Sequence, residues 1–267
     1  MDEPILDGVA AWLAAARSAV ALTGAGISTD SGIPDFRGPQ GVWTRDPKAE
    51  ARADIRYYLS DPEVRRSAWQ TRLHHPGRNA RPNPGHRALA ELDRLGRIAL
   101  LITQNIDGLH LLAGNPPERT VEIHGTMRDY VCLSCGDRGP MDEALARVRA
   151  GDEDPACVDC GGILKSATIS FGQSLVPEDL ARAEQAAAAS DLFLAVGTSL
   201  TVYPVAWLPE RALANGARLV IVNAEPTPLD ARAHAVLRGQ IGEILPALVS
   251  RLGGADRAPL PAANRQG

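Results

Sequence analysis

Short apolar runs alternate with amphipathic segments along this chain, and that alternation limits the folds open to it. Four runs, each bounded by turn residues, have the length of buried strands: 19–22, 98–103, 192–196 and 219–222. Helical periodicity fills the segments 5–16, 177–189 and 205–214, and Asn215-Gly216 is a typical helix stop. Strands that alternate with helices favour a parallel sheet. We therefore predict an α/β fold whose parallel sheet is covered by helices on both faces.

Two segments interrupt this alternation and predict a second, smaller lobe. Residues 41–85 carry aromatic residues, histidines and prolines among many charges without a clear strand, and residues 129–165 contain all four cysteines of the 267-residue chain. We interpret both as insertions into the α/β unit, one helical and one metal-binding. The larger domain then consists of residues 1–40, 86–128 and 166–252. Residues 253–267, with little apolar content, are expected to form a disordered tail.

The cysteines form two Cys-x-x-Cys pairs, which is the spacing of a zinc ribbon. The first pair is Cys132 and Cys135, and the second is Cys157 and Cys160. The spacer between them, residues 136–156, is close to the roughly 15–20 residues of the common zinc pattern. Glycines after each pair suit knuckle turns in which backbone amides face thiolate sulfurs. Because four thiolates fill every position of a tetrahedral Zn²⁺, we predict one structural zinc ion and expect the chemistry elsewhere.

Composition and charge exclude some classes of partner. There are 28 Lys plus Arg against 32 Asp plus Glu, and the formal net charge of −4 argues against a protein that mainly binds nucleic acid phosphates. The acidic neighbours of the cysteines also make the zinc ribbon a poor phosphate binder. No apolar run in the sequence approaches the length of about 20 residues that spans a bilayer. The first residues are acidic, whereas a signal peptide begins with basic residues. We expect a cytoplasmic protein with no nucleic acid or membrane partner.

The loop after the first predicted strand, TGAGISTDSGIPDFRG at residues 23–38, almost matches a dinucleotide-binding fingerprint. In that fingerprint, Gly-x-Gly-x-x-Gly follows a strand and lets backbone amides reach a pyrophosphate. Gly24 and Gly26 fit the pattern, but Thr29 stands where the third glycine belongs. A tight turn without a ligand also needs glycines, so this loop alone leaves both interpretations open.

Polar residues follow two further apolar runs, at the edge where open α/β sheets bind ligands. Gln104, Asn105 and Asp107 come directly after the second run, although Asn and Asp also cap loops without binding anything. His124 ends a short run just before the cysteine segment, where the two lobes must meet. A neutral imidazole with a pKa near ~6.5 suits it to accept a proton from an alcohol, so we predict a general base there. Other histidines, in charged or helical surroundings, are expected at the surface: His74, His75, His86 and His234.

The combination and order of these motifs resemble the sirtuin family from about residue 5 to about residue 250. The motifs that carry the resemblance are Gly24-Ala-Gly-Ile-Ser28, Ser31-Gly-Ile-Pro-Asp-Phe-Arg37, Gln104-Asn-Ile-Asp107, His124-Gly125, the two cysteine pairs, Gly197-Thr-Ser199 and Asn223. The resemblance implies a Rossmann-like large domain, a small lobe bearing zinc, and NAD and an acyl-lysine peptide bound in the cleft between them. It also implies that NAD is consumed: nicotinamide leaves and the acyl group ends on ADP-ribose.

The resemblance further implies roles for individual residues. His124 would take a proton from the nicotinamide ribose hydroxyls, and Asn105 and Asp107 would line the nicotinamide pocket as the other catalytic residues. The NAD-binding residues that it implies are Gly24, Ala25, Gly26, Ile27, Ser28, Asp35, Phe36, Arg37, Trp43, Gln104, Asn105, Ile106, Asp107, Gly197, Thr198, Ser199, Asn223, Ala224, Glu225 and Ile241. The residues implied to contact the acylated protein substrate are Phe171, Gly172, Gln173 and Val202.

The chain departs from the family pattern in the segment expected to bind substrate. Many sirtuins have two phenylalanines, glycine and glutamate where this chain has Ser-Phe-Gly-Gln at 170–173. This segment would pair with the substrate backbone as an added strand, and Phe171 would wall the acyl-lysine tunnel. Members that remove acidic acyl groups share a Tyr-x-x-Arg pair, but Ser60 and Asp61 stand at that spacing after the two tyrosines of the insertion. We therefore expect short neutral acyl groups, acetyl first.

Three functions are compatible with the sequence. The first is an NAD-dependent protein-lysine deacetylase. The second is a protein ADP-ribosyltransferase, because another nucleophile can attack the same activated ribose. The third is a non-catalytic module that binds NAD or zinc, although a pure binder has no need for His124, Asn105 and Asp107 together.

Overall fold

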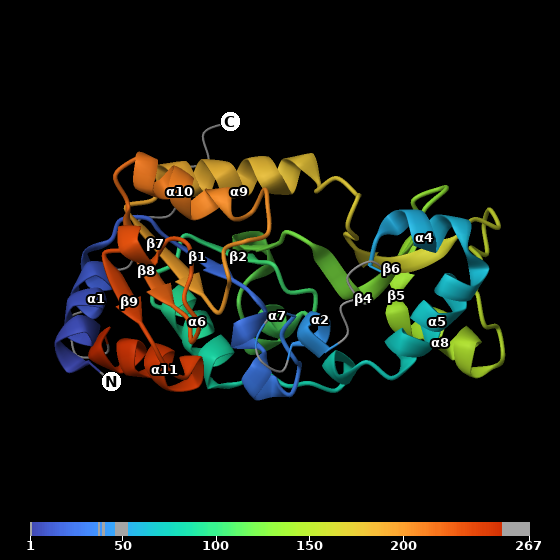
Figure 1. Cartoon of the computed structure of the whole chain (residues 1–267), viewed down its shortest axis with the longest axis horizontal. Coiled ribbons are helices and arrows are strands. Elements are labelled where there is room, and N and C mark those ends of the chain that lie inside the picture. The colour runs from blue at the N-terminus through green and yellow to red at the C-terminus, as the bar shows by residue number, and fades with distance from the viewer. Residues whose placement is uncertain (1, 37, 39–40, 46–52, 253–267) are drawn as a thin grey trace.

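The computed structural model describes residues 2–36, 38, 41–45 and 53–252, which form two lobes around separate sheets (Figure 1). The larger sheet is parallel, with the strand order β3-β2-β1-β7-β8-β9. Its strands are β1 (Ala19–Thr23), β2 (Leu100–Thr103), β3 (Thr120–Glu122), β7 (Leu192–Val196), β8 (Arg218–Val222) and β9 (Ala235–Leu237). The order reverses between β1 and β7, so the switch point, where such sheets bind ligands, lies at their carboxyl ends.

The four apolar runs predicted as strands are confirmed as β1, β2, β7 and β8. β1, β2 and β7 are buried along their whole length, and β8 is buried after its first residue. Strands covered on both faces have no polar face, which is why they stand out in the sequence as continuous apolar runs. β3 and β9 are only three residues long and gave a weaker signal.

Helices cover both faces of this sheet, as predicted (Figure 1). One face carries α1 (Glu3–Ala15), α6 (Pro84–Arg94) and α11 (Ile241–Leu252), which share an apolar core with the sheet. The other face carries α9 (Pro177–Ala189) and α10 (Trp207–Ala214) over a second core. The short elements of this lobe are α7 (Leu109–Ala113), η1 (Ala25–Ile27), η2 (Thr29–Ser31), η4 (Pro117–Arg119) and η5 (Asp230–Arg232). The predicted α/β class is therefore confirmed.

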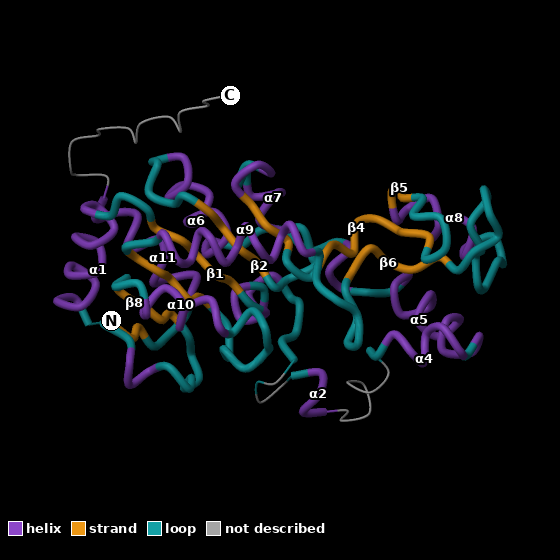
Figure 2. Tube along the Cα trace, turned by 90° about the horizontal axis from the view of Figure 1, so that it is seen from above, coloured by secondary structure: helices purple, strands orange, loops and turns teal. Residues whose placement is uncertain are grey.

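The smaller lobe is built on a three-stranded antiparallel sheet, and Figure 2 shows it set to one side of the larger sheet. Its strands are β4 (Gly125–Cys132), β5 (Arg138–Pro140) and β6 (Leu164–Thr168). Its helices are α4 (Ile55–Ser60), α5 (Pro62–Leu73) and α8 (Met141–Arg149). Trp69 is fully buried in a core of its own with Leu145 and Leu164. The predicted boundary at residue 166 falls inside β6, and the exact division into domains stays a prediction.

Two further short elements, α2 (Val42–Arg45) and η3 (Pro76–Arg78), lie in the segment 41–85. The predicted tail at 253–267 lies outside the described residues. Over the part of the chain that the structure describes, no helix is long and apolar enough to cross a membrane.

Two segments, 123–126 and 167–170, run between the lobes side by side, and we call them the crossing. The Ile169 N–H donates to the His124 carbonyl oxygen at 2.8 Å, and Gly125 pairs with Thr168. Gly125 has φ +72°, and a Cβ added to it would lie 2.1 Å from the carbonyl oxygen of Ala167. Only glycine fits at this point. The crossing is therefore a tight contact between two backbones.

Candidate active site and zinc centre

The glycine-rich loop after β1 packs directly against the loop after β7, at the switch point. The Gly24 N–H donates to the Val196 oxygen at 3.1 Å, and the Gly26 N–H donates to the Gly197 oxygen at 2.8 Å. A Cβ on Gly26 would lie 2.8 Å from the Gly197 Cα, and a Cβ on Gly24 would lie 2.8 Å from the Gly197 oxygen. Both glycines are therefore required by loop-to-loop packing, whatever ligand binds beside them. A short 3₁₀ turn follows in place of an α-helix, so the third glycine is not needed.

A buried hydrogen-bond network joins this loop to the polar residues after β2. Ser28 Oγ donates to Asp107 Oδ2 at 2.7 Å and accepts from Asn105 Nδ2 at 3.0 Å. Asn105 Nδ2 also approaches the Gly24 oxygen at 3.1 Å, and Asp107 Oδ1 accepts from the Leu109 N–H at 2.9 Å. Ser28, Asn105 and Asp107 are all buried. The amide and the carboxylate are thus held in fixed orientations by the protein alone.

A buried histidine supports this network, and the prediction that His86 lies at the surface is wrong. His86 is fully buried near the start of α6, where it forms a capping box with Asn83. The Asn83 N–H approaches His86 Nδ1 at 3.4 Å, so Nδ1 is the acceptor and Nε2 carries the proton toward Ser28 Oγ, also 3.4 Å away. Burial lowers the pKa of His86 to about 4, so the ring is neutral at pH 7. The Asn-Pro-x-His pattern of a capping box is the sequence signal that was missed.

His110, which was not predicted to have a role, continues the same buried layer. Its ring centroid lies 4.9 Å from that of His86, and its Nε2 is 2.9 Å from Thr23 Oγ1. Thr23 Oγ1 donates in turn to Thr103 Oγ1 at 2.8 Å. Burial lowers the pKa of His110 to about 3. Both imidazole rings of this layer are therefore neutral at pH 7.

His124 lies in the crossing, and its ring is oriented by the loop after β2. Its Nδ1 is 3.0 Å from the carbonyl oxygen of Gln104. Because a carbonyl only accepts, Nδ1 carries the proton and the lone pair is on Nε2. Burial lowers the pKa of His124, and the hydrogen bond to Gln104 raises it. The effect of burial is the larger, so the pKa lies below its usual 6.5. The ring is neutral at pH 7 and can accept a proton at Nε2.

Several of the other predicted NAD-binding residues gather at the ends of β2, β7 and β8. Gln104 Nε2 donates to Thr198 Oγ1 at 2.8 Å, which ties the loop after β2 to the loop after β7. Asn223 is buried, and its Nδ2 donates to the Glu225 oxygen at 2.7 Å. Ile241 begins α11 and lies beside the glycine turn after β7. Residues from the two halves of the sheet therefore meet at the switch point. The remaining predicted residues of these loops are Ile106, Gly197, Ser199 and Ala224, and those of the loop after β1 are Ala25 and Ile27.

The rest of the predicted cofactor loop is described only in part. Asp35 Oδ1 accepts from the Gly38 N–H at 3.0 Å, and Phe36 is exposed. Trp43 lies in α2, and Arg37 lies outside the described residues. The role of this loop in NAD binding stays a prediction.

The predicted substrate segment follows the crossing and pairs with the helical insertion. The Phe171 N–H donates to the Ala53 oxygen at 3.1 Å, and the Phe171 oxygen accepts from the Ile55 N–H at 2.9 Å. Gln173 closes a small loop, because its Oε1 accepts from the Ser170 N–H at 2.9 Å while its own N–H donates to the Ser170 oxygen at 3.0 Å. Phe171 is 39% exposed. The Phe171 backbone is thus paired with the helical insertion, while its side chain is partly exposed. The other predicted substrate residues are Gly172, exposed, and Val202, half-buried after β7.

The four cysteines come together at one end of the smaller lobe. Their sulfurs all lie within 4.8 Å of one another, with 3.5 Å between Cys132 and Cys160 and 3.7 Å between Cys135 and Cys157. Four sulfurs bound tetrahedrally at ~2.3 Å from Zn²⁺ would be about 3.8 Å apart. The Ser134 N–H donates to Cys132 Sγ at 3.4 Å, as expected of a knuckle turn. The donor set fits one structural zinc ion with no open position.

Comparisons with known proteins give the same assignment. The family model that matches the chain, over residues 24–204, is described as "Sir2 family". A protein of Streptomyces coelicolor, named NAD-dependent protein deacetylase 2, is 53% identical over 87% of this chain and 96% of its own length. A protein of Pyrobaculum aerophilum, named NAD-dependent protein deacetylase 1, is 44% identical over 93% of this chain and 95% of its own.

Solved structures agree with the relatives. A structure titled "Sir2-p53 peptide-NAD+" superposes with a TM-score of 0.83 at 33% identity, covering 93% of this chain and 98% of the other. Another, titled "Structural Basis for the Mechanism and Regulation of Sir2 Enzymes", has a TM-score of 0.84 at 38% identity, over 94% and 98%. With its sheet order, its cysteine tetrad and its His124 site, the chain belongs to the Sir2 family.

Proposed function

We propose that this chain is an NAD-dependent protein-lysine deacetylase that yields nicotinamide, deacetylated lysine and O-acetyl-ADP-ribose. The observation that carries the proposal is His124, a neutral imidazole with its lone pair on Nε2, placed where the two lobes meet. A pure binding module has no use for a base in that place. The relatives named NAD-dependent protein deacetylases support the same reaction.

NAD supplies an electrophilic ribose carbon when its bond to nicotinamide breaks. The proposed role of His124 is to take a proton at Nε2 from a hydroxyl of that ribose, which makes the hydroxyl oxygen a nucleophile toward the acyl carbon. Its Nδ1–H remains on the Gln104 carbonyl, so the ring does not rotate as it gains charge at Nε2. Burial favours the neutral ring, which keeps the base unprotonated before reaction.

Asn105 and Asp107 would hold the nicotinamide end of the cofactor. The chemistry of these side chains fits a carboxamide, because an amide and a carboxylate accept its N–H groups. Ser28 already forms a hydrogen bond with one carboxylate oxygen of Asp107 and accepts one from the amide nitrogen of Asn105. Both side chains are therefore ordered before the cofactor binds. The neutral His86 beneath Ser28 adds no cation that would compete for Asp107.

The proposed adenosine side lies across the switch point, at Gly197, Thr198, Ser199, Asn223, Ala224, Glu225 and Ile241. The loop that carries Asp35, Phe36, Arg37 and Trp43 is proposed to cover the pyrophosphate and ribose. Support comes from the fold, because ligands of open α/β sheets bind at this crevice.

Acetyl-lysine in a protein chain is the proposed substrate, lying against Phe171 and Val202. A basic side chain that would pair with an acidic acyl group is missing at the expected spacing in the insertion. The two tyrosines there do not replace it: Tyr58 is buried and donates from its hydroxyl to the Leu164 oxygen at 2.7 Å, while Tyr57 is exposed. Short neutral acyl groups are therefore the proposed class.

We also propose that the protein acts in the cytoplasm and on proteins rather than nucleic acids. The four cysteines are not joined in disulfides, and the chain has a formal net charge of −4. A nucleic acid substrate would need an excess of cations that this composition does not provide.

A single mass-spectrometric assay tests the proposal. The zinc-loaded protein is incubated with NAD and an acetylated peptide, and we expect nicotinamide and O-acetyl-ADP-ribose in equal amounts. The matched control is the same peptide with unmodified lysine, which should release almost no nicotinamide. Label from the adenylate part of NAD retained on protein would indicate ADP-ribosyl transfer, and unchanged NAD in both arms would indicate a binding module.

A further inference from the structure

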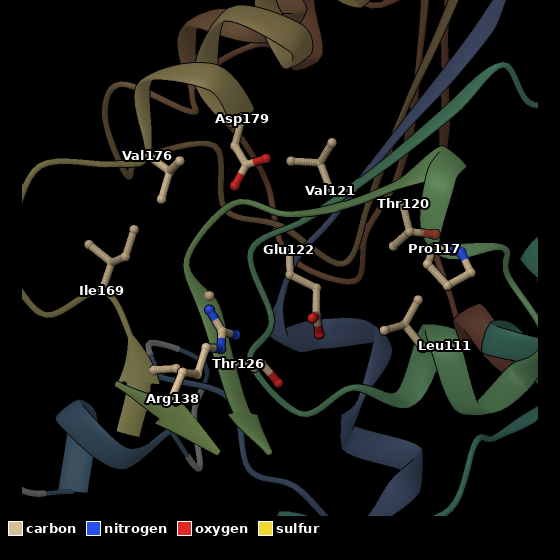
Figure 3. Close-up of a pocket in the computed structure, with 12 residues that line it drawn as sticks. Leu111, Pro117, Thr120, Val121, Glu122, Thr126, Arg138, Ile169, Val176 and Asp179 are labelled. Atoms are coloured by element: carbon tan, nitrogen blue, oxygen red, sulfur yellow. The ribbon is translucent and has the colours of Figure 1, made fainter. Parts of the chain in front are cut away.

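A cavity of about 270 Å³ lies at the free edge of β3, beside the crossing (Figure 3). Its walls come from both lobes: β3 and the first turn of α9 on one side, and the adjoining ends of β4 and β6 on the other. No residue assigned above to NAD, peptide or zinc is among those that line it. The cavity is therefore separate from the proposed active site.

Two carboxyl groups face this cavity from different elements (Figure 3). Glu122 is the last residue of β3, and Asp179 lies in the first turn of α9. Both side chains are half-buried, and within the described ranges of the chain neither has a hydrogen bond or an ion pair. A partly desolvated carboxylate without a partner is costly, so these groups are suited to a cation.

The charges that surround Glu122 do not supply that cation. Burial is the main cause that raises the pKa of Glu122 to about 7, and Asp107 and Asp129 add to it, while Arg138 and Arg128 act the other way. Arg138 reaches the rim of the cavity, but its guanidinium pairs with Asp129 at 3.0 Å and is 53% exposed. The charged residues that line the cavity are therefore Glu122, Asp179 and Arg138, and of these only Arg138 is in an ion pair with another described residue.

Apolar side chains form the rest of the wall near these carboxyl groups. Leu111, Val121, Ile169 and Val176 line the cavity, and Leu111 and Val176 are 36% and 45% exposed. Exposed apolar side chains around a recessed polar pair are typical of a site for an amphiphilic small molecule. We propose that this cavity binds a small organic cation, a primary ammonium group attached to an apolar body, with the ammonium between Glu122 and Asp179.

The position of the cavity gives the ligand contacts with both lobes at once. Val176 and Asp179 belong to the larger lobe, while Thr126 and Ala167 belong to strands of the smaller lobe that leave the crossing. Glu122 is also two residues from His124. A cation in this place would therefore contact both lobes next to the segment that carries the proposed base.

The test uses phenethylamine as the probe, with 2-phenylethanol and phenylacetate as neutral and anionic controls of the same shape. Binding to the full zinc-loaded chain is measured by calorimetry at pH 8, with and without saturating NAD. We expect the ammonium to bind at least about tenfold more tightly than the alcohol, because only the ammonium makes a charge-assisted hydrogen bond with a carboxylate. Phenylacetate should not bind. Equal binding of the alcohol, no binding of the ammonium, or displacement of the ammonium by NAD would each overturn the proposal.

Variants locate the bound probe. Glu122→Gln and Asp179→Asn keep the shape of each side chain, and each should weaken phenethylamine binding by about tenfold or more. Glu178→Gln is the matched control, because Glu178 lies in the same turn of α9 but is exposed and does not line the cavity. Unchanged binding in both Glu122→Gln and Asp179→Asn would refute the site.

The pH dependence gives an independent readout. Because a cation favours the ionised form of Glu122, affinity should rise from pH 6 to pH 8 as that carboxyl group loses its proton. The rise should be smaller in Glu122→Gln, which lacks this carboxyl group. An affinity that is flat in the unmodified chain would contradict the proposed contact.

Discussion

Replacing Gly26 by alanine separates the structural role of the glycine loop from its role toward a ligand. The added Cβ would lie 2.8 Å from the Gly197 Cα and 2.9 Å from its oxygen, and these are backbone atoms that cannot rotate away. The two loops must separate, which strains the 2.8 Å hydrogen bond from the Gly26 N–H to the Gly197 oxygen. The lost bond costs about 1 kcal/mol, and the overpacking costs about 1–3 kcal/mol. We expect the free energy of unfolding to fall by about 2–4 kcal/mol.

The assay is a urea titration followed by circular dichroism, carried out without NAD and repeated with it. Gly8→Ala is the matched control, because Gly8 lies inside α1 and a Cβ there would have nothing within 4 Å. That substitution should raise the free energy of unfolding by about 0.5–1 kcal/mol. NAD affinity of each folded variant is measured in parallel.

A free energy of unfolding for Gly26→Ala within about 0.5 kcal/mol of the unmodified chain would refute the packing argument. If stability were unchanged but NAD affinity fell, the glycine would serve the ligand and not the loop contact. Gly197→Ala tests the same contact from the other loop. It should also destabilise the chain because an alanine would be strained at the φ of +61° found there. Because both glycines act on one contact, the double variant should lose less stability than the two single losses added together.

Three further predictions test the site and the smaller lobe. His124→Ala should lower deacetylation by about 10²–10⁴-fold while NAD still binds, with exposed His74→Ala unchanged. Because the pKa of His124 is lowered from 6.5, kcat/KM should fall with decreasing pH only below 6.5, and an acid limb above that value would exclude this histidine as the base. The unmodified chain should contain one zinc per chain by atomic emission, and Cys132→Ser should lose the metal and melt at lower temperature, since Cys132 packs in the core with Trp69. Full zinc content in that variant would contradict the tetrathiolate site. Finally, burial lowers the pKa of Lys165 from 10.5 to about 7. Between these two pH values the unfolded chain binds more protons than the folded chain, so the free energy of unfolding should rise with pH over this interval. In urea titrations, the free energy of unfolding of the unmodified chain relative to that of Lys165→Met should be higher at pH 9 than at pH 7. The same difference between the two chains at both pH values would show that Lys165 is not desolvated.

The sequence was most informative where burial on both faces leaves a long apolar run. β1 and β7 could be found in this way, and the helix at 177–189 has the predicted bounds. His124 could be placed at a strand end because the histidine directly follows the short run Val121-Glu122-Ile123. Such signals are local, and they do not depend on which segments meet in three dimensions.

Contacts between distant segments could not be predicted in the same way. His86 stands among charged and turn residues, yet it is buried because Asn83 caps α6 and Ser28 lies against its ring. Gly26 was interpreted from its own loop, whereas the atoms that require it belong to Gly197. Glu122 looked like one polar residue in a short strand, and only the packing of α9 beside it encloses a cavity. In each case at least one partner lies more than fifty residues away in the chain.

The tight fit at Gly125 has a mechanical consequence for the neighbouring base. If the smaller lobe pivots about this point, each atom moves in proportion to its distance from the pivot. The Cα of His124 is one residue away, about 3.8 Å, so a rotation of ~15° would displace it by only about 1 Å. The cysteine tetrad at the far end of the same lobe would sweep a much longer arc. With such a pivot, a large displacement of the cysteine tetrad would be accompanied by only a small displacement of the His124 backbone.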